Sequence, residues 1–361
     1  MWVEVKWNDQ IHFKKGYKFK ELWRRWMSSE PKRDLRFVGN GGYGRLGLGS
    51  LESQWRPVPV FALPENQWLK PLLVVAPYPL LTDNGRVYAA GLNDFGQLGR
   101  SENIMDGELY IWGKKLQWTA WSWKKAAKVV SVPTKIECLS GIRIKLAALG
   151  SDTQLLLLGL EDLDGHESSI LGFLRSSSEY TPDLSRNLRK QGQNAAAGLL
   201  HSACIDGLCL FFGEEAADKM KLPYSDEVAC GGYHTCVVTS GGELYTWGSN
   251  ENGCLGIGST DAFHSPERVQ GPFSRFLFTR FVSCGWKHTA ATPVRACNVF
   301  TWGWGGSHGT FSEDGYSSGG QLGHGNDVDF IKPKMVNFGK NVKALQVSCG
   351  FNHSGAVLEY V

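Results

Sequence analysis

The sequence lacks any apolar run long enough to cross a membrane as a helix. Its longest apolar stretch, 71–81, has eleven residues and contains three prolines, whereas a spanning helix needs about 20 apolar residues. Residues 1–36 hold ten Lys or Arg against five Asp or Glu without a continuous apolar core, so we expect no secretory signal there. Neither a membrane span nor a clear targeting peptide is therefore predicted.

The nine cysteines include no Cys-x-x-Cys pair. Three of them, Cys230, Cys284 and Cys349, each stand directly before a glycine in a repeated element. A cysteine that recurs at one repeat position is typical of a small buried residue in a reducing compartment and not of a disulfide framework. The chain is thus expected to be intracellular.

Signatures of catalysis are missing as well. The sequence has no His-Glu-x-x-His and no evident nucleophile–base pair. The stretch GNGGYG (39–44) resembles a nucleotide-binding loop, but no helix and acidic residue follow it as such a loop requires. We therefore predict no catalytic residue, no cofactor and no metal site, and an enzymatic role stays open only for chemistry without a covalent step.

Glycine, in contrast, is abundant, with 44 residues spread along the whole chain. The segment GGYHTCVVTSGGELYTWGSNENGCLGIGS (231–259) shows the full repeat, and Gly-x-x-His-Ser/Thr recurs at 198–202, 231–235, 285–289 and 350–354. ELYTW alternates polar and apolar residues as a half-buried strand does, and the Asn and Gly residues after it favour a turn. The positions that we expect to be structural in each repeat are His201, His234, His288, His353, Gly231, Gly285, Gly350, Trp247 and Trp302.

The repeat spacing predicts the fold class. Seven strands close on a glycine, namely Gly39, Gly91, Gly113, Gly159, Gly213, Gly248 and Gly303. The intervals between them are 52, 22, 46, 54, 35 and 55 residues, and most lie near about fifty, the length of a four-stranded propeller blade. We therefore predict an all-β chain on a seven-bladed β-propeller plan in which about two blades are incomplete. Missing strands would leave unpaired edges, so closure of the ring is an open question.

Motifs such as ACGGYHTCVVTSGGELYTWGSNENGCLG, SCGWKHTAA and SCGFNHSGAVLE resemble the regulator of chromosome condensation repeat family. The likeness covers residues 37–361, leaves 1–36 as a basic and aromatic N-terminal extension, and is nearest to plant members, a branch that includes mitochondrial proteins. It implies a non-enzymatic protein-interaction scaffold, plausible in organelle gene expression, with RNA as a possible partner through a complex. It also implies a mitochondrial location, with nucleus or cytoplasm as alternatives, while the oligomeric state stays open.

The family offers two other functions. One is guanine nucleotide exchange on a small GTPase, for which the degenerate early repeats give no transferable contact residues. The other is UV-B perception by tryptophans clustered through a repeated Gly-Trp-Arg-His-Thr motif. Here that motif occurs once, at 285–289, with Lys287 in place of Arg, so we disfavour photoreception.

Two segments depart from the repeat and suggest a shifted reading frame. After LYIWGK the pattern calls for Gly-Gln-Leu-Gly-Leu-Gly, but WTAWSW stands at 118–123. One permitted set of codons for these six residues encodes the expected motif when it is read one base later. Possible codons for residues 73–79 likewise encode Cys-Gly-Gly and His-Thr in other reading frames, although this match is weaker. We therefore hypothesise that parts of 66–80 and 114–125 are frame-shifted; a genuine aromatic strand is the alternative.

The most distinctive loop is 303–329, which inserts about a dozen residues before its Gly-Gln-Leu-Gly. Insertions in a propeller lie on one face, often the binding face. A tolerated, solvated insertion is the alternative. The partner-binding candidates are His308, Phe311, Glu313, Asp314 and Tyr316.

Overall fold

The computed structural model describes the backbone of part of the chain. The described residues are 3–5, 33–60, 70–71, 78–81, 87–91, 110–114, 129–135, 146–149, 153–161, 167–175, 194–199, 201–205, 209–212, 217–219, 222–271, 279–294, 298–306, 319–339 and 341–360. They form β-strands and turns, with one 3-10 turn, η1 (Gly42–Gly44). No helix in these segments is long and apolar enough to cross a membrane.

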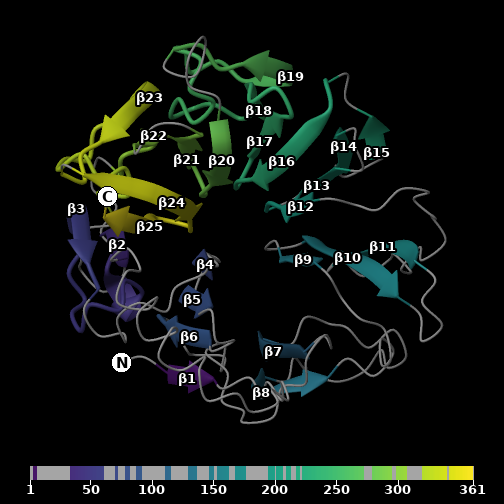
Figure 1. Cartoon of the computed structure of the whole chain (residues 1–361), viewed down its shortest axis with the longest axis horizontal. Coiled ribbons are helices and arrows are strands. Elements are labelled where there is room, and N and C mark those ends of the chain that lie inside the picture. The colour runs from purple at the N-terminus through teal and green to yellow at the C-terminus, as the bar shows by residue number, and fades with distance from the viewer. Residues whose placement is uncertain are drawn as a thin grey trace, which may run out of the picture.

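Seven antiparallel sheets stand around a common centre, as blades of a propeller (Figure 1). Three blades take four consecutive strands each, ordered outward from the centre. They are β12 (Asn194–Ala197), β13 (Ser202–Ile205), β14 (Cys209–Phe212) and β15 (Ala217–Lys219); β16 (Ser225–Cys230), β17 (His234–Thr239), β18 (Leu244–Gly248) and β19 (Phe263–Arg268); and β20 (Thr279–Cys284), β21 (His288–Pro293), β22 (Val299–Gly303) and β23 (Phe330–Val336).

One blade joins a segment near the N-terminus to the C-terminal segment. Its inner strands are β24 (Val342–Cys349) and β25 (His353–Tyr360), and its outer strands are β2 (Arg33–Gly39) and β3 (Gln54–Pro59). β2 pairs with β25 from Arg33 opposite Glu359 to Gly39 opposite His353. Strands that are about 300 residues apart in the sequence therefore hydrogen-bond within one sheet.

A polar network and an apolar core hold that blade together. The Arg36 guanidinium donates to the Asp34 carboxylate at 2.8 Å and to the Tyr360 hydroxyl at 2.7 Å, and the Tyr360 hydroxyl donates to Asp34 at 2.9 Å. Phe37 beside them is fully buried. Burial of an aromatic side chain contributes the larger share, since hydrogen bonds exchange partners with water on folding.

The remaining three blades have fewer strands or borrow one. β4 (Lys70–Pro71), β5 (Tyr78–Leu81) and β6 (Val87–Ala90) form a blade whose outer place is taken by β1 (Val3–Val5), paired with β6. Within the described residues, one of the other two blades consists of β7 (Tyr110–Lys114) and β8 (Val129–Lys135). The other consists of β9 (Leu146–Leu149), β10 (Thr153–Glu161) and β11 (Glu167–Arg175). The all-β, seven-bladed plan is confirmed.

The seven glycines counted in the sequence mark the seven blades. Each lies in or directly after a strand of a different sheet, and Gly39, Gly91, Gly248 and Gly303 have φ values of 105°, 124°, 110° and 96°. Only glycine adopts this region without strain. One of them occupies a different strand: Gly159 lies in β10, the second strand of its sheet and not the third.

One expected gap is wrong. The short interval after 213 suggested missing strands, yet the sheet of β12–β15 is complete. What is short there is the connection 213–216 between the third and fourth strands, compared with 249–262 in the next blade. The connection is shorter but no strand is missing from this sheet, so sequence intervals alone misplace the second incomplete blade.

The segment before residue 37 also contributes strands. β2 begins at Arg33, and β1 lies within the first few residues. The boundary between extension and propeller stays a prediction, since most of residues 1–32 lie outside the described part of the chain.

Proline occurs at the same place in three outer strands. Pro57, Pro266 and Pro333 lie in the outer strands β3, β19 and β23, and Pro133 lies in β8. Proline lacks an N–H donor and so blunts the exposed edge of a sheet.

The core lies between neighbouring sheets. Its largest cluster joins the blade of β16–β19 to the blade of β20–β23 through side chains of both, with Trp302 fully buried at the contact. Because every complete blade is buried on both faces by its neighbours, the inner strands read as continuous apolar or small residues, as in HTCVVT and HTAATP.

Candidate functional site

The repeated histidines lie inside the ring and link one blade to the next. His234 Nε2 lies 2.9 Å from the Thr289 hydroxyl, and His288 Nε2 lies 2.9 Å from the Ser354 hydroxyl, each in the following blade. The Thr289 hydroxyl donates its only proton to the Cys254 carbonyl at 2.8 Å. It must therefore accept from His234, so this ring carries its proton on Nε2.

Burial keeps these imidazoles neutral. It lowers the pKa of His234 to about 3, helped by repulsion from His201 and His288, and it lowers the pKa of His201 and of His288 to about 4. The pKa of His353 is likewise held well below its usual value by burial, with Arg45 nearby. The four histidines are buried and belong to four different blades.

The glycine three residues before each histidine provides the room for its ring. A Cβ on Gly285 would overlap the ring of His288 and lie 2.6 Å from the Gly350 carbonyl oxygen of the next blade. A Cβ on Gly231 or Gly350 would overlap His234 or His353 in the same way. A side chain at any of these three positions would therefore collide with its neighbours.

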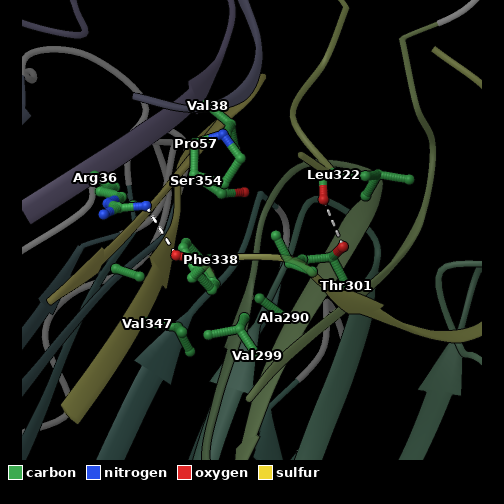
Figure 2. Close-up of a pocket in the computed structure, with 13 residues that line it drawn as sticks. Arg36, Val38, Pro57, Ala290, Val299, Thr301, Leu322, Phe338, Val347 and Ser354 are labelled. Atoms are coloured by element: carbon green, nitrogen blue, oxygen red, sulfur yellow. Dashed lines mark hydrogen bonds between the residues drawn. The ribbon is translucent and has the colours of Figure 1, made fainter. Parts of the chain in front are cut away.

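Trp247 and Trp302, the other repeat positions, are buried at blade interfaces. The Trp302 indole donates to the Cys254 carbonyl at 2.8 Å, across to the preceding blade. Val38 of β2 occupies the corresponding position in the blade of β24, β25, β2 and β3, two residues after Arg36, and a cavity lies beside it (Figure 2). The cavity leaves about 20 Å³ for water-sized molecules, room for about one water and far too little for a ligand.

One face of the propeller gathers the turns that differ from blade to blade, and we call it the turn face. In an antiparallel blade, the turn between strands one and two and the loop between strands three and four open on the same side. In the three best-described blades the turn face therefore comprises 231–233, 285–287 and 350–352, with the loop residues 40–53, 249–262, 304–306 and 319–329.

An aromatic cluster lies on the turn face. The Trp286 and Phe351 rings stack with centroids 3.9 Å apart, and the Trp304 ring meets Trp286 edge-on at 6.3 Å. The Trp286 indole also lies close to Gly232 of the preceding blade, whose N–H donates to the Trp286 carbonyl at 3.0 Å. Trp286, Phe351 and Trp304 are half-buried, and Tyr233 in the turn 231–233 is 43% exposed. Aromatic rings that remain partly exposed in such a group are typical of protein contact surfaces.

Sequence reasoning missed this cluster, although a signal was present. Gly232, Trp286 and Phe351 occupy the same repeat position, directly after the first glycine of Gly-x-x-His, in three successive blades. Equal positions in neighbouring blades are adjacent in the ring, so the contact was predictable. The contact of Trp304 with Trp286 was not predictable in this way, because Trp304 does not belong to the repeated Gly-x-x-His motif.

Charge on the turn face is mostly negative. Its described carboxylates are Glu52, Glu251, Asp261, Asp327 and Asp329. Its described cations are two: Arg45 is buried, and Lys287 lies 5.6 Å from the Trp286 ring centre and 3.2 Å from the Glu251 carboxylate. The Glu251 side chain is 74% exposed. The face thus differs in sign from the whole chain, whose formal charge is +3.

The predicted contact residues His308, Phe311, Glu313, Asp314 and Tyr316 lie outside the described residues. The two ends of their loop are described. Gly306 and Gly319 are in contact, and the Gly320 N–H donates to the Gly305 carbonyl at 3.0 Å. The insertion therefore leaves and re-enters the turn face at one point, two residues from Trp304.

Comparison with known proteins matches the repeats. Residues 241–292 and 315–357 match the regulator of chromosome condensation (RCC1) repeat, and 226–254 match a second form of it. The chain is 28% identical over 332 residues to the ultraviolet-B receptor UVR8 of Arabidopsis thaliana, covering 92% of this chain and 60% of the relative. It is 26% identical over 350 residues to the probable E3 ubiquitin-protein ligase HERC4 of Rattus norvegicus, covering 88% of this chain and 29% of that one. The chain thus spans less than two thirds of the length of these relatives.

Solved structures agree on the fold. Prp20p of Saccharomyces cerevisiae matches with a TM-score of 0.70 and 18% identity over 92% of both chains. Human WBSCR16 matches with a TM-score of 0.52 and 19% identity, covering 90% of this chain and 80% of that one. Together with the seven sheets and the histidine hydrogen bonds between blades, these matches show a β-propeller fold in which residues 226–292 and 315–357 match regulator of chromosome condensation repeats.

Proposed function

We propose that the chain is a non-enzymatic protein-interaction scaffold, and that the turn face is its contact surface. The observation that carries this is the half-exposed aromatic cluster of Trp286, Phe351 and Trp304 at the base of the 307–318 insertion. Trp286 and Phe351 stack on one another from two successive blades and stay only half-buried.

The charge of the turn face indicates the chemistry of the partner. The turn face carries the exposed carboxylates of Glu52, Glu251 and Asp261, and Lys287 is already paired with Glu251. A partner segment rich in Arg and Lys would find ion pairs at the rim and cation–π contacts on the rings. We therefore propose that the turn face binds a cationic segment of a protein partner.

Binding of a labelled arginine- and lysine-rich peptide, measured by fluorescence anisotropy on the full chain, tests the proposal. We expect saturable binding that weakens with salt, and about tenfold weaker binding for Glu251→Gln combined with Asp327→Asn. Asp226→Asn is the matched control, since Asp226 is exposed at the start of β16, away from the turn face. Equal losses in both variants, or no binding by the wild type, would overturn the proposal.

Guanine nucleotide exchange is the alternative. The yeast protein Prp20p has binding properties toward Gsp1p and histones, but an identity of 18% carries only the fold to this chain. Accelerated release of labelled GDP from small GTPases by the full chain would favour exchange over a purely passive scaffold. A GTPase could also be the partner without exchange, in which case binding would occur and GDP release would stay at its basal rate.

The cellular setting is proposed from family resemblance alone. A mitochondrial location and a part in organelle gene expression, including RNA reached through a complex, are the specific forms of the scaffold role. Cell fractionation tests the location. RNA crosslinking tests the partner, and salt-dependent RNA binding lost on removal of residues 1–36 would assign it to the basic extension.

A further inference from the structure

Two thiols and one imidazole meet between the blade of β16–β19 and the blade of β20–β23. The ligand-forming atoms of His234, Cys236 and Cys284 all lie within 4.8 Å of one another, and all three residues are buried. His234 and Cys236 point the same way from β17, and Cys284 ends β20 of the next blade. Sequence spacing hid this cluster because Cys284 lies 48 residues after Cys236.

Comparison of the repeats shows that this cluster differs from the residues at the same positions in the other described blades. The position two residues after the repeated histidine is Ala203, Ala290 or Gly355 in the other described blades, and Cys236 here. The position before the repeated glycine is Ala197, Cys230, Cys284 or Cys349. Among the described blades only this interface therefore pairs a thiol with a thiol.

We propose that His234, Cys236 and Cys284 bind a thiophilic divalent cation of the Zn²⁺ type, which clamps the two blades together. Two thiolates and a neutral imidazole around a divalent ion have no net charge, which suits a buried site. Both thiols release their protons to solvent when the ion binds. Three protein ligands leave one of the four positions that zinc usually takes for a small molecule such as water.

The dimensions are compatible with such an ion. Zinc lies about 2.3 Å from sulfur and about 2.0 Å from nitrogen, so tetrahedral sulfur ligands are about 3.8 Å apart. Shifts of about 1 Å or less would bring atoms now within 4.8 Å to this spacing. The neutral imidazole offers a lone pair at Nδ1 in its present tautomer, or at Nε2 after tautomer exchange and loss of the hydrogen bond to Thr289.

Titration of the reduced full chain with Cd²⁺ and with Zn²⁺ tests the site. We expect one ion per chain, a thiolate-to-cadmium absorption band, and a higher melting temperature with either ion. Cys236→Ala and Cys284→Ala should each lose the band and the rise in melting temperature. Both variants should fold, since each restores the alanine that another blade carries at that position.

Cys349→Ala is the control, because Cys349 has the same repeat position as Cys284 but lies outside the cluster. It should bind as the wild type does. No binding by the reduced wild type would overturn the proposal, and so would binding that survives Cys236→Ala. The outcome is independent of the turn face, since a failed peptide titration leaves these metal measurements unaffected.

Discussion

Trp286 stacks on Phe351 with ring centroids 3.9 Å apart, although the two residues belong to successive blades and lie 65 positions apart in the chain. The stack exists because both residues follow the first glycine of the same repeated turn. The propeller thus brings single aromatic residues of separate repeats into one surface, which the insertion 307–318 adjoins. The blades form a scaffold, and the differences between their turns give the turn face its chemistry.

Gly285→Ala should lower the free energy of unfolding by about 1–3 kcal/mol, the usual cost of forcing extra volume into a packed interior. The new Cβ would overlap the His288 ring and approach the Gly350 carbonyl oxygen. Chemical denaturation measures the change. Gly241→Ala is the control, because its nearest neighbour would lie 3.7 Å from the new Cβ, and an equal loss in both variants would contradict the account.

Acid should destabilise the ring through its histidines. The folded-state pKa of His201, His234 and His288 lies near 3 or 4, below the ordinary value of about 6.5. Below pH 6.5 the unfolded chain therefore binds protons that the folded chain does not, and stability rises with pH between about 4 and 6.5. Above pH 6.5 these histidines are neutral in both states, so they no longer make the free energy of unfolding depend on pH.

Each such histidine adds about 1.4 kcal/mol per pH unit to the slope within this range. His288→Gln should therefore give a shallower dependence of unfolding free energy on pH by about that amount. Urea denaturation at several pH values measures it. Carboxylates contribute equally to both proteins, so parallel curves would show that His288 is not held neutral in the folded state.

Val38→Ile should stabilise the protein by about 0.5–1 kcal/mol, because one added methylene can fill a small cavity without overpacking it. The cavity of Figure 2 lies beside Val38 and has room for about one water. A thermal shift relative to the wild type measures the effect. Val38→Ala, which enlarges the cavity, should shift the melting temperature downward, and a fall in both would show that the added methylene does not fit.

Excision of the insertion should leave the fold intact. Since Gly306 and Gly319 are in contact, replacing 307–318 by a short turn should change the melting temperature by no more than about 2 °C. Partner binding should weaken if His308, Phe311, Glu313, Asp314 and Tyr316 contribute contacts. Unchanged binding would remove those five residues from the proposal while leaving the aromatic cluster in it.

The repeat period predicted the ring well because each blade repeats the same local physics. Alternating strands and positive-φ glycines such as Gly248 and Gly303 are legible in the sequence. Pairings between segments that are far apart in the sequence could not be predicted from it. β1 has only three residues, Val3–Val5, and nothing in them indicates that they complete the outer edge of a blade. The thiol pair of Cys236 and Cys284 likewise depends on the order of blades around the ring.

Hydrogen exchange of the full chain, with and without the cationic peptide, tests the central claim most directly. We expect the peptide to slow exchange at turn-face residues 231–233, 249–253, 285–287 and 350–352, while the outer strands β19 and β23 exchange as before. Protection confined to the outer strands, or to the opposite side around 240–242, would contradict the assignment of the turn face as the contact surface.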